Sequence, residues 1–103
     1  MALIAQNGIL SGTIEADGVH GEISFNGYFA LQINNISGAT VIVEASLDNK
    51  ANWAAVKDAS YTVDTVVGGL APIDNNRRTW YRLRVTGYTA PITITMMQGY
   101  ATP

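Results

Sequence analysis

Cysteine is absent from this chain of 103 residues, and charged residues are scarce. Without cysteine, the fold can use neither disulfide bonds nor a thiolate metal site. Charged residues make up only 14% of the sequence and hydrophobic residues 48%, a low share of charge for a freely soluble monomer. The net charge of −2 gives no electrostatic reason to expect nucleic acid or an anionic membrane as a partner. We therefore expect part of the surface to be covered by protein partners.

The sequence also lacks a long apolar run and a basic N-terminal region. No stretch approaches the length of a membrane span, and the opening MALIAQNG does not form a secretory signal. We expect a protein that is made in a cytoplasm, is not exported by the standard route and has no membrane partner. The length suffices for one domain, which we place at residues 1–103, with residues 1–8 as an N-terminal arm.

Residues 39–56 read as a strand, a polar turn and a returning strand. Apolar side chains alternate with others along residues 40–47, which is the period of a strand with one buried face. The residues expected on that buried face are Val41, Val43, Ala45 and Leu47. Asp48-Asn49-Lys50 supplies turn chemistry, because Asp and Asn side chains bond their own backbone. We expect Trp53 to pack back over the first strand as part of the hairpin core.

Turn residues divide the rest of the chain into short segments, and helical periodicity is missing. Asp17-Gly18 is a two-residue hairpin signal that would pair residues 12–16 with 19–25. Asn26-Gly27 is a second such signal, but its register sets apolar residues opposite polar ones, so a bulge or a switch to another sheet must intervene. Further strands are expected at residues 3–6, 28–34, 61–67, 79–86 and 92–98, with a break at Gly68-Gly69 and a short edge piece at 70–73.

Seven or eight short strands joined by short turns predict a single antiparallel β-sandwich, of the jelly-roll or immunoglobulin-like type. Residues 3–6 would pair either with another element or with another chain. On the strand at 79–86, we expect Tyr81, Leu83 and Val85 on one face and Trp80, Arg82 and Arg84 on the other.

We find no catalytic constellation in the sequence. The single histidine, His20, has neither a triad partner nor ligand spacing, so we interpret it as structural. Glu15, Asp17 and Glu22 are interpreted as solvated charges, because hard cations need several oxygens that converge from a fixed loop. Asp48 lies in a turn with no assignable partner acid. We therefore predict a protein that is not an enzyme, with no catalytic residue, no metal and no cofactor.

Four of the six positive residues cluster in one turn and strand: Arg77, Arg78, Arg82 and Arg84. Because Arg82 and Arg84 share a strand face with Trp80, a guanidinium could stack on the indole. Two interpretations stay open, a cross-strand salt-bridge row and a docking face for an acidic protein. A sugar platform built from Trp53 and Trp80 is a weaker alternative, since Trp53 is expected in the core.

Residues 46–53, SLDNKANW, resemble the Asp-box, a hairpin motif of the form S-x-D-x-G-x-x-W, with Lys50 in place of the glycine. Asp-boxes are usually structural, so Ser46, Asp48 and Trp53 are expected to hold the hairpin, and no sialidase-like activity follows. VIVEASLDNKANWAAV followed by WYRLRVTGYTAPITITM resembles small all-β virion proteins of tailed bacteriophages. In those proteins a strand ending S-x-D-G-G-T-x-W precedes R-x-R-V-T-x-Y-T-S-G-x-I-T-V. The resemblance runs from about residue 28 onward, and Ala90-Pro91 replaces the usual Ser-Gly.

This resemblance implies a structural virion protein, most specifically a capsid decoration (cement) protein that stabilises the head by bridging capsid subunits. It implies a homotrimer, the major capsid protein as partner, and a place on the capsid surface after assembly in the host cytoplasm. We expect contacts through residues 1–6 and 99–103, with the arginines as a secondary face. The contact residues expected in the terminal segments are Leu3, Ile4, Gln6 and Tyr100. The alternatives are a tail, neck or baseplate component of the same fold, or a carbohydrate-binding module for host attachment, which would need an exposed Trp80.

Overall fold

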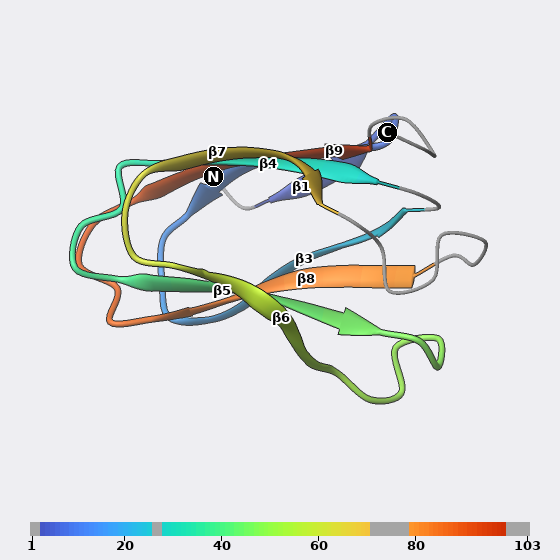
Figure 1. Ribbon diagram of the computed structural model, residues 1–103. Coiled ribbons are helices and arrows are strands. Elements are labelled where there is room, and N and C mark those ends of the chain that lie inside the picture. Colours follow the sequence, from blue (N-terminus) through green and yellow to red (C-terminus); the bar gives the residue numbers. More distant parts are fainter. Residues whose placement is uncertain (1–2, 26–27, 71–78, 99–103) are drawn as a thin grey trace.

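The computed structural model describes residues 3–25, 28–70 and 79–98, which form nine β-strands and no helix. One antiparallel sheet contains, in spatial order, β1 (Ile4–Gln6), β2 (Ile9–Ile14), β9 (Ile92–Gln98), β4 (Phe29–Asn34) and β7 (Thr65–Leu70). The other contains β3 (Gly18–Phe25), β8 (Thr79–Thr86), β5 (Thr40–Ser46) and β6 (Ala54–Tyr61). Figure 1 shows the two sheets as two layers. The predicted antiparallel β-sandwich is confirmed, with nine strands instead of seven or eight.

From β2 to β9, strands pair in order from the two ends of the chain inward, which is the pattern of a jelly roll. β2 pairs with β9, β3 with β8, β4 with β7 and β5 with β6. These pairs form a single long hairpin with the β5–β6 turn at its tip, folded so that successive pairs alternate between the sheets. The pairings β4–β9 and β5–β8 then complete each sheet. Two four-stranded sheets connected in this way are a jelly roll, to which β1 adds a fifth strand in one layer.

The hydrophobic core fills the space between the two sheets. Alternate residues of the central strands point into it, because side chains alternate along a strand. From β8 these are Tyr81, Leu83 and Val85, and from β9 they are Ile92, Ile94 and Met96. The two faces predicted for residues 79–86 are therefore confirmed. The rings of Phe25, Phe29 and Tyr81 gather in this core, with the Phe29 and Tyr81 centroids 4.6 Å apart.

The connection after β2 crosses between the sheets instead of making a hairpin. Ile14, the last residue of β2, pairs with Ile92, whereas Gly18 begins β3 in the other sheet and pairs with Val85. The hairpin predicted at Asp17-Gly18 is therefore wrong. Asp17 instead holds the crossing in place, because its Oδ1 accepts a hydrogen bond of 2.7 Å from the backbone nitrogen of Tyr88.

The chain also changes sheet between β3 and β4, which resolves the register conflict predicted around residues 25–28. Asn26-Gly27 itself lies outside the described residues. The strand predicted at residues 61–67 is confirmed only from Thr65 onward, because Tyr61 ends β6 in one sheet and Thr65 begins β7 in the other. Gly68-Gly69 lies inside β7, beside a register shift against β4, and does not break the strand. The edge piece expected at 70–73 falls largely outside the described residues.

β1 is an edge strand of the five-stranded sheet. It pairs with β2 through a tight turn at Asn7 and Gly8, whose φ angles are 55° and 76°. Asn-Gly is the pair that hairpin turns with two positive φ angles favour. Of the two partners left open for residues 3–6, the structure therefore shows an element of the same chain.

Candidate functional site

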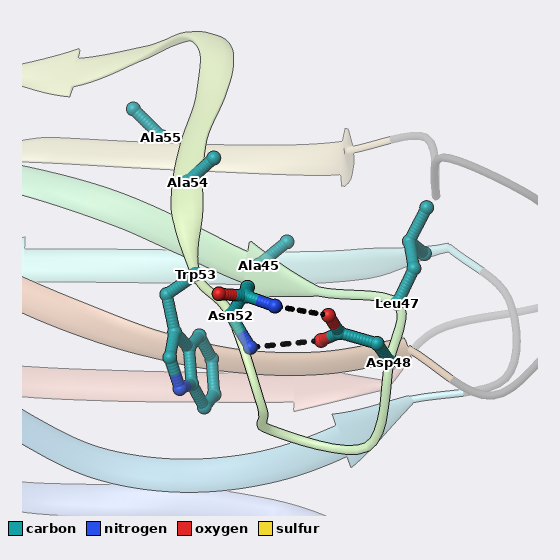
Figure 2. A pocket seen from close by; sticks show the side chains of 7 residues that line it. All are labelled: Ala45, Leu47, Asp48, Asn52, Trp53, Ala54 and Ala55. Atoms are coloured by element: carbon teal, nitrogen blue, oxygen red, sulfur yellow. Dashed lines mark hydrogen bonds between the residues drawn. The ribbon is translucent and has the colours of Figure 1, made fainter.

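A network of hydrogen bonds around Asp48 closes the β5–β6 hairpin (Figure 2). Asp48 Oδ1 accepts from Ser46 Oγ at 2.7 Å and from the Asn52 backbone nitrogen at 2.9 Å, and Oδ2 accepts from the Asn52 side-chain amide at 2.8 Å. These hydrogen bonds, from Asn52 first and then from Ser46, lower the pKa of Asp48 from 3.8 to about 2. The carboxylate therefore stays ionised near neutral pH and serves as the acceptor that holds the turn.

Lys50 has a backbone φ of 73°, in the left-handed region that favours glycine. Its position is the one where the Asp-box pattern has glycine. Its backbone nitrogen donates to Ser46 Oγ at 2.9 Å. Its Nζ lies 3.4 Å from Glu22 Oε1 and 4.5 Å from the centroid of the Trp80 ring. The side chain of Lys50 thus ties the tip of the hairpin to β3 and β8.

A positively charged side chain lies over each tryptophan ring. The Arg82 guanidinium lies 4.3 Å from the centroid of the Trp53 ring, and the Lys50 ammonium lies over the Trp80 ring. The expected stacking of an arginine on an indole therefore occurs at Trp53 and not at Trp80. The prediction that Trp53 belongs to the hairpin core is wrong, because its half-buried ring lies against Arg82, outside the hydrophobic core.

Glu44 joins β5 to β8 through a cross-strand row of ion pairs. Its Oε1 accepts from Arg82 Nε at 2.7 Å and its Oε2 from Arg84 Nε at 2.9 Å. Burial raises the pKa of Glu44, but hydrogen bonds from both arginines and their positive charges lower it more, so that it lies below the usual 4.5. The predicted salt-bridge row is confirmed for Arg82 and Arg84. Arg77 and Arg78 lie outside the described residues.

A shallow pocket of about 340 Å³ lies beside the hairpin turn (Figure 2). Its lining residues are Ala45, Leu47, Asp48, Asn52, Trp53, Ala54 and Ala55. Asp48 is the only acid among them, and its two oxygens already accept three hydrogen bonds. Glycoside hydrolysis by general acid–base chemistry uses two carboxyl groups, so the lining of this pocket does not supply that chemistry.

His20 and the acidic residues near it each have a separate partner. His20 Nε2 lies 2.8 Å from the Ala16 carbonyl oxygen, Asp17 accepts from Tyr88, and Glu22 pairs with Lys50. Within residues 3–25, 28–70 and 79–98, no three His, Cys, Asp or Glu side chains are grouped so that they could hold a metal ion.

The contact residues predicted near the N-terminus divide into two kinds. Ile4 and Gln6 have exposed side chains on β1, whereas Leu3 is partly buried and packs against the core. Tyr100 lies outside the described part of the chain. Among the described residues of this group, Ile4 and Gln6 are therefore the ones whose side chains are exposed.

Sequence reasoning missed a broad surface, the outer face of the five-stranded sheet, which we call the uncharged face. Its residues, which alternate with core residues along β2, β4 and β9, are Ile4, Gln6, Ile9, Ser11, Thr13, Ala30, Gln32, Asn34, Val66, Thr93, Thr95 and Met97. None of them is charged. The alternation of large apolar with neutral residues in 9–14, 29–34 and 92–98 was visible in the sequence. Their adjacency was not, because it arises from pairings between strands far apart in the chain.

No protein-family model, curated protein or solved structure matches this chain. Within the described residues, no helix is long and apolar enough to cross a membrane.

Proposed function

We propose that this chain is a non-enzymatic structural subunit of a tailed-phage particle, most specifically a capsid decoration protein that stabilises the head by bridging capsid subunits. The observation that carries this proposal is the uncharged face, which spans all five strands of one sheet. Depletion of charge is the compositional mark of the centre of a protein interface. A surface of this kind suits a subunit that is covered by other protein in its working state.

Bridging requires at least two contact surfaces, and the sandwich provides two of different chemistry. The uncharged face lies on one side. On the other side, the outer face of the four-stranded sheet carries Glu44 between Arg82 and Arg84, with Trp53 beside Arg82. Arg84 is the more exposed of the two arginines, with 42% of its side chain accessible. This second face is suited to a polar or acidic protein surface.

The order of the two resembling segments supports a virion protein over other structural roles. Jelly rolls also occur among viral capsid and lectin domains, which is an argument by analogy and weaker than the surfaces themselves. A tail, neck or baseplate component would use the same surfaces. The carbohydrate-binding alternative has less support, because a cation already lies over each tryptophan ring, Lys50 over Trp80 and Arg82 over Trp53.

The test is the copy number of this chain relative to the major capsid protein, measured by quantitative mass spectrometry on purified particles made from the genome that encodes it. We expect a ratio near unity, or a simple fraction that matches a symmetry axis of the capsid lattice. A handful of copies per particle would move the protein to the tail, neck or baseplate. Absence from the particles would overturn the virion proposal.

A further inference from the structure

The uncharged face exposes apolar side chains at both edges and along its central strand. The exposed fraction is 53% for Ile4 on β1 and 76% for Val66 on β7, at opposite edges of the sheet. Met97 on β9 and Ile9 on β2 are 40% and 37% exposed. These are four of the seven large hydrophobic residues that the described chain leaves exposed. Exposed apolar residues gathered on one face mark an interaction site.

β9 is the central strand of this sheet, with β2 and β4 on its two sides and β1 and β7 at the edges. The register places five residues in one row across it: Ile4, Ser11, Thr95, Gln32 and Val66. The row is symmetric in chemistry about Thr95. Each side has first a neutral polar residue and then an exposed apolar one.

In the rows on either side, the two neighbours of the β9 residue also match each other in chemistry. Met97 has the apolar residues Ile9 and Ala30 as its neighbours on β2 and β4. Thr93 has the neutral polar residues Thr13 and Asn34 in the same positions. A rotation of 180° about an axis along β9 exchanges the two sides of the sheet. It therefore sets apolar residues against apolar ones and polar residues against polar ones on β2, β9 and β4 in all three rows, and Ile4 against Val66 at the edges of the middle row.

We propose that two copies of this chain pair face to face through the uncharged face, about a two-fold axis that runs along β9 past Thr95. In this arrangement Val66 of each copy lies over Ile4 of the other, and the two Thr95 residues meet at the axis. A hollow of about 440 Å³ lies at the β1–β2 edge, where it receives Val66 of the second copy; its lining residues are Ile4, Gln6, Asn7, Ile9, Ser11 and Gly12. Contacts of this reciprocal kind define a two-fold interface.

The absence of charge favours a second copy over a charged partner. Charged groups of such a partner would lose their hydration against a face without counter-charges, which disfavours the complex. A second copy brings no charge to the interface. Its Ser, Thr, Asn and Gln side chains carry both donors and acceptors, so polar rows can satisfy one another.

The area of the uncharged face is that of a weak, reversible dimer interface. The three residues of β1 and the six or seven of each other strand rise about 3.3 Å per residue, with strands about 4.8 Å apart, and cover roughly 450 Å² per copy and roughly 900 Å² in total. This total lies just below the limit of about 1,000 Å² for a specific, stable interface, in the range of weak pairs. We therefore expect association that depends on protein concentration.

The inference deepens the proposed function by naming an occupant of the shared surface, and it rests on that function only for the role of the pair in a particle. Its test uses the purified full chain, without particles. Sedimentation equilibrium over a range of concentrations should show a monomer–dimer equilibrium. Thr95→Lys should weaken dimerisation at least tenfold, because it sets two lysines against each other at the axis. Thr86→Lys, the matched control on an exposed position of the other sheet, should leave it unchanged.

A charge pair tests the two-fold geometry itself. Val66→Lys and Ile4→Glu should each weaken dimerisation, and the double variant should regain it, because every lysine then faces a glutamate of the other copy. Within one chain these positions are about 19 Å apart, four strand spacings, so the rescue has to occur between copies. Both positions lie at exposed sheet edges, so the test does not depend on the folding of Thr95→Lys.

A monomer at all concentrations, a trimer, or a double variant without rescue would overturn the two-fold pair. A monomer would indicate that another protein covers the face, and a trimer would favour the assembly that the phage resemblance implies. The proposed role in a particle is tested separately. A chain that is monomeric in solution but present in particles at high copy number would overturn only the two-fold pair. A chain that dimerises but is absent from particles would overturn only the role in the particle.

Discussion

Glu44 on β5 and Arg82 on β8 are cross-strand neighbours, joined by a hydrogen bond of 2.7 Å although 38 residues separate them in the chain. Glu44 is only 8% exposed, and its other oxygen accepts from Arg84. The carboxylate thus keeps two guanidinium groups close together on one face. On the outer face of the four-stranded sheet, this one carboxylate therefore pairs with both arginines.

Glu44→Gln should lower the free energy of unfolding by about 2 kcal/mol, because hydrogen bonds to charged groups contribute about 1.5–3 kcal/mol and two like charges remain. Urea unfolding measures this change. Glu22→Gln is the matched control, since Glu22 is exposed and pairs with Lys50 at 3.4 Å. Its cost should be under about 1 kcal/mol. Equal costs for the two variants would contradict a central role for Glu44.

Asp48 should make part of the stability depend on acid pH. Its pKa is about 2 in the folded chain, below the usual 3.8, so folding favours the ionised form. The stabilisation is complete above the unfolded pKa and is lost as the pH falls through the interval from 3.8 to about 2. Asp48→Asn should be less stable than the wild type at pH 5, and the gap should narrow toward pH 2.

Urea unfolding of both proteins from pH 5 to pH 2 measures that gap. Glu44 also has a lowered pKa, but it titrates in both proteins, so the difference between them isolates Asp48. A gap that stays constant over this range would show that the Asp48 carboxylate does not hold the turn by its charge.

Lys50 has a positive φ, which predicts an unusual order of substitutions. Lys50→Gly should be more stable than Lys50→Ala by about 1 kcal/mol, because alanine keeps a Cβ in the left-handed region and glycine does not. Both variants lose the contacts with Glu22 and Trp80, so these cancel in the comparison. At Ala51, which has no positive φ, substitution by glycine should destabilise instead. An alanine variant as stable as the glycine variant would contradict the backbone assignment.

Thr79 begins β8 and is fully buried, and its Oγ1 has no hydrogen-bond partner among the described residues. Thr79→Val keeps the shape and removes the buried hydroxyl, so it should raise the free energy of unfolding by about 1 kcal/mol. Thr79→Ser keeps the hydroxyl and removes a methyl group, so it should cost about 1 kcal/mol. Thermal unfolding compares the three proteins, and a destabilised valine variant would show that the hydroxyl has a partner.

Local chemistry made the β5–β6 hairpin predictable. Ser46, Asp48 and Asn52 lie within six residues of one another, and the hydrogen bonds among them need no other part of the chain. The strand alternation of residues 79–86 was predictable for a similar reason, since a strand between two layers buries every second residue. The prediction failed at Leu47, which is 52% exposed because β5 ends at Ser46. The end of a strand depends on its neighbours as well as on its own pattern.

Asp17-Gly18 shows where local chemistry was insufficient. The pair favours a hairpin, but pairing β2 with β9 and β3 with β8 requires the chain to cross between sheets at that point. The same non-local pairing placed Arg82 on Trp53, left Lys50 for Trp80, and brought neutral residues of five strands onto one face. The sequence by itself determined an all-β chain with one hairpin whose turn is closed by its own side chains. Only the tertiary structure decided which strands became neighbours and which residues share a surface, because burial of the core sets those pairings over distances that local signals do not reach.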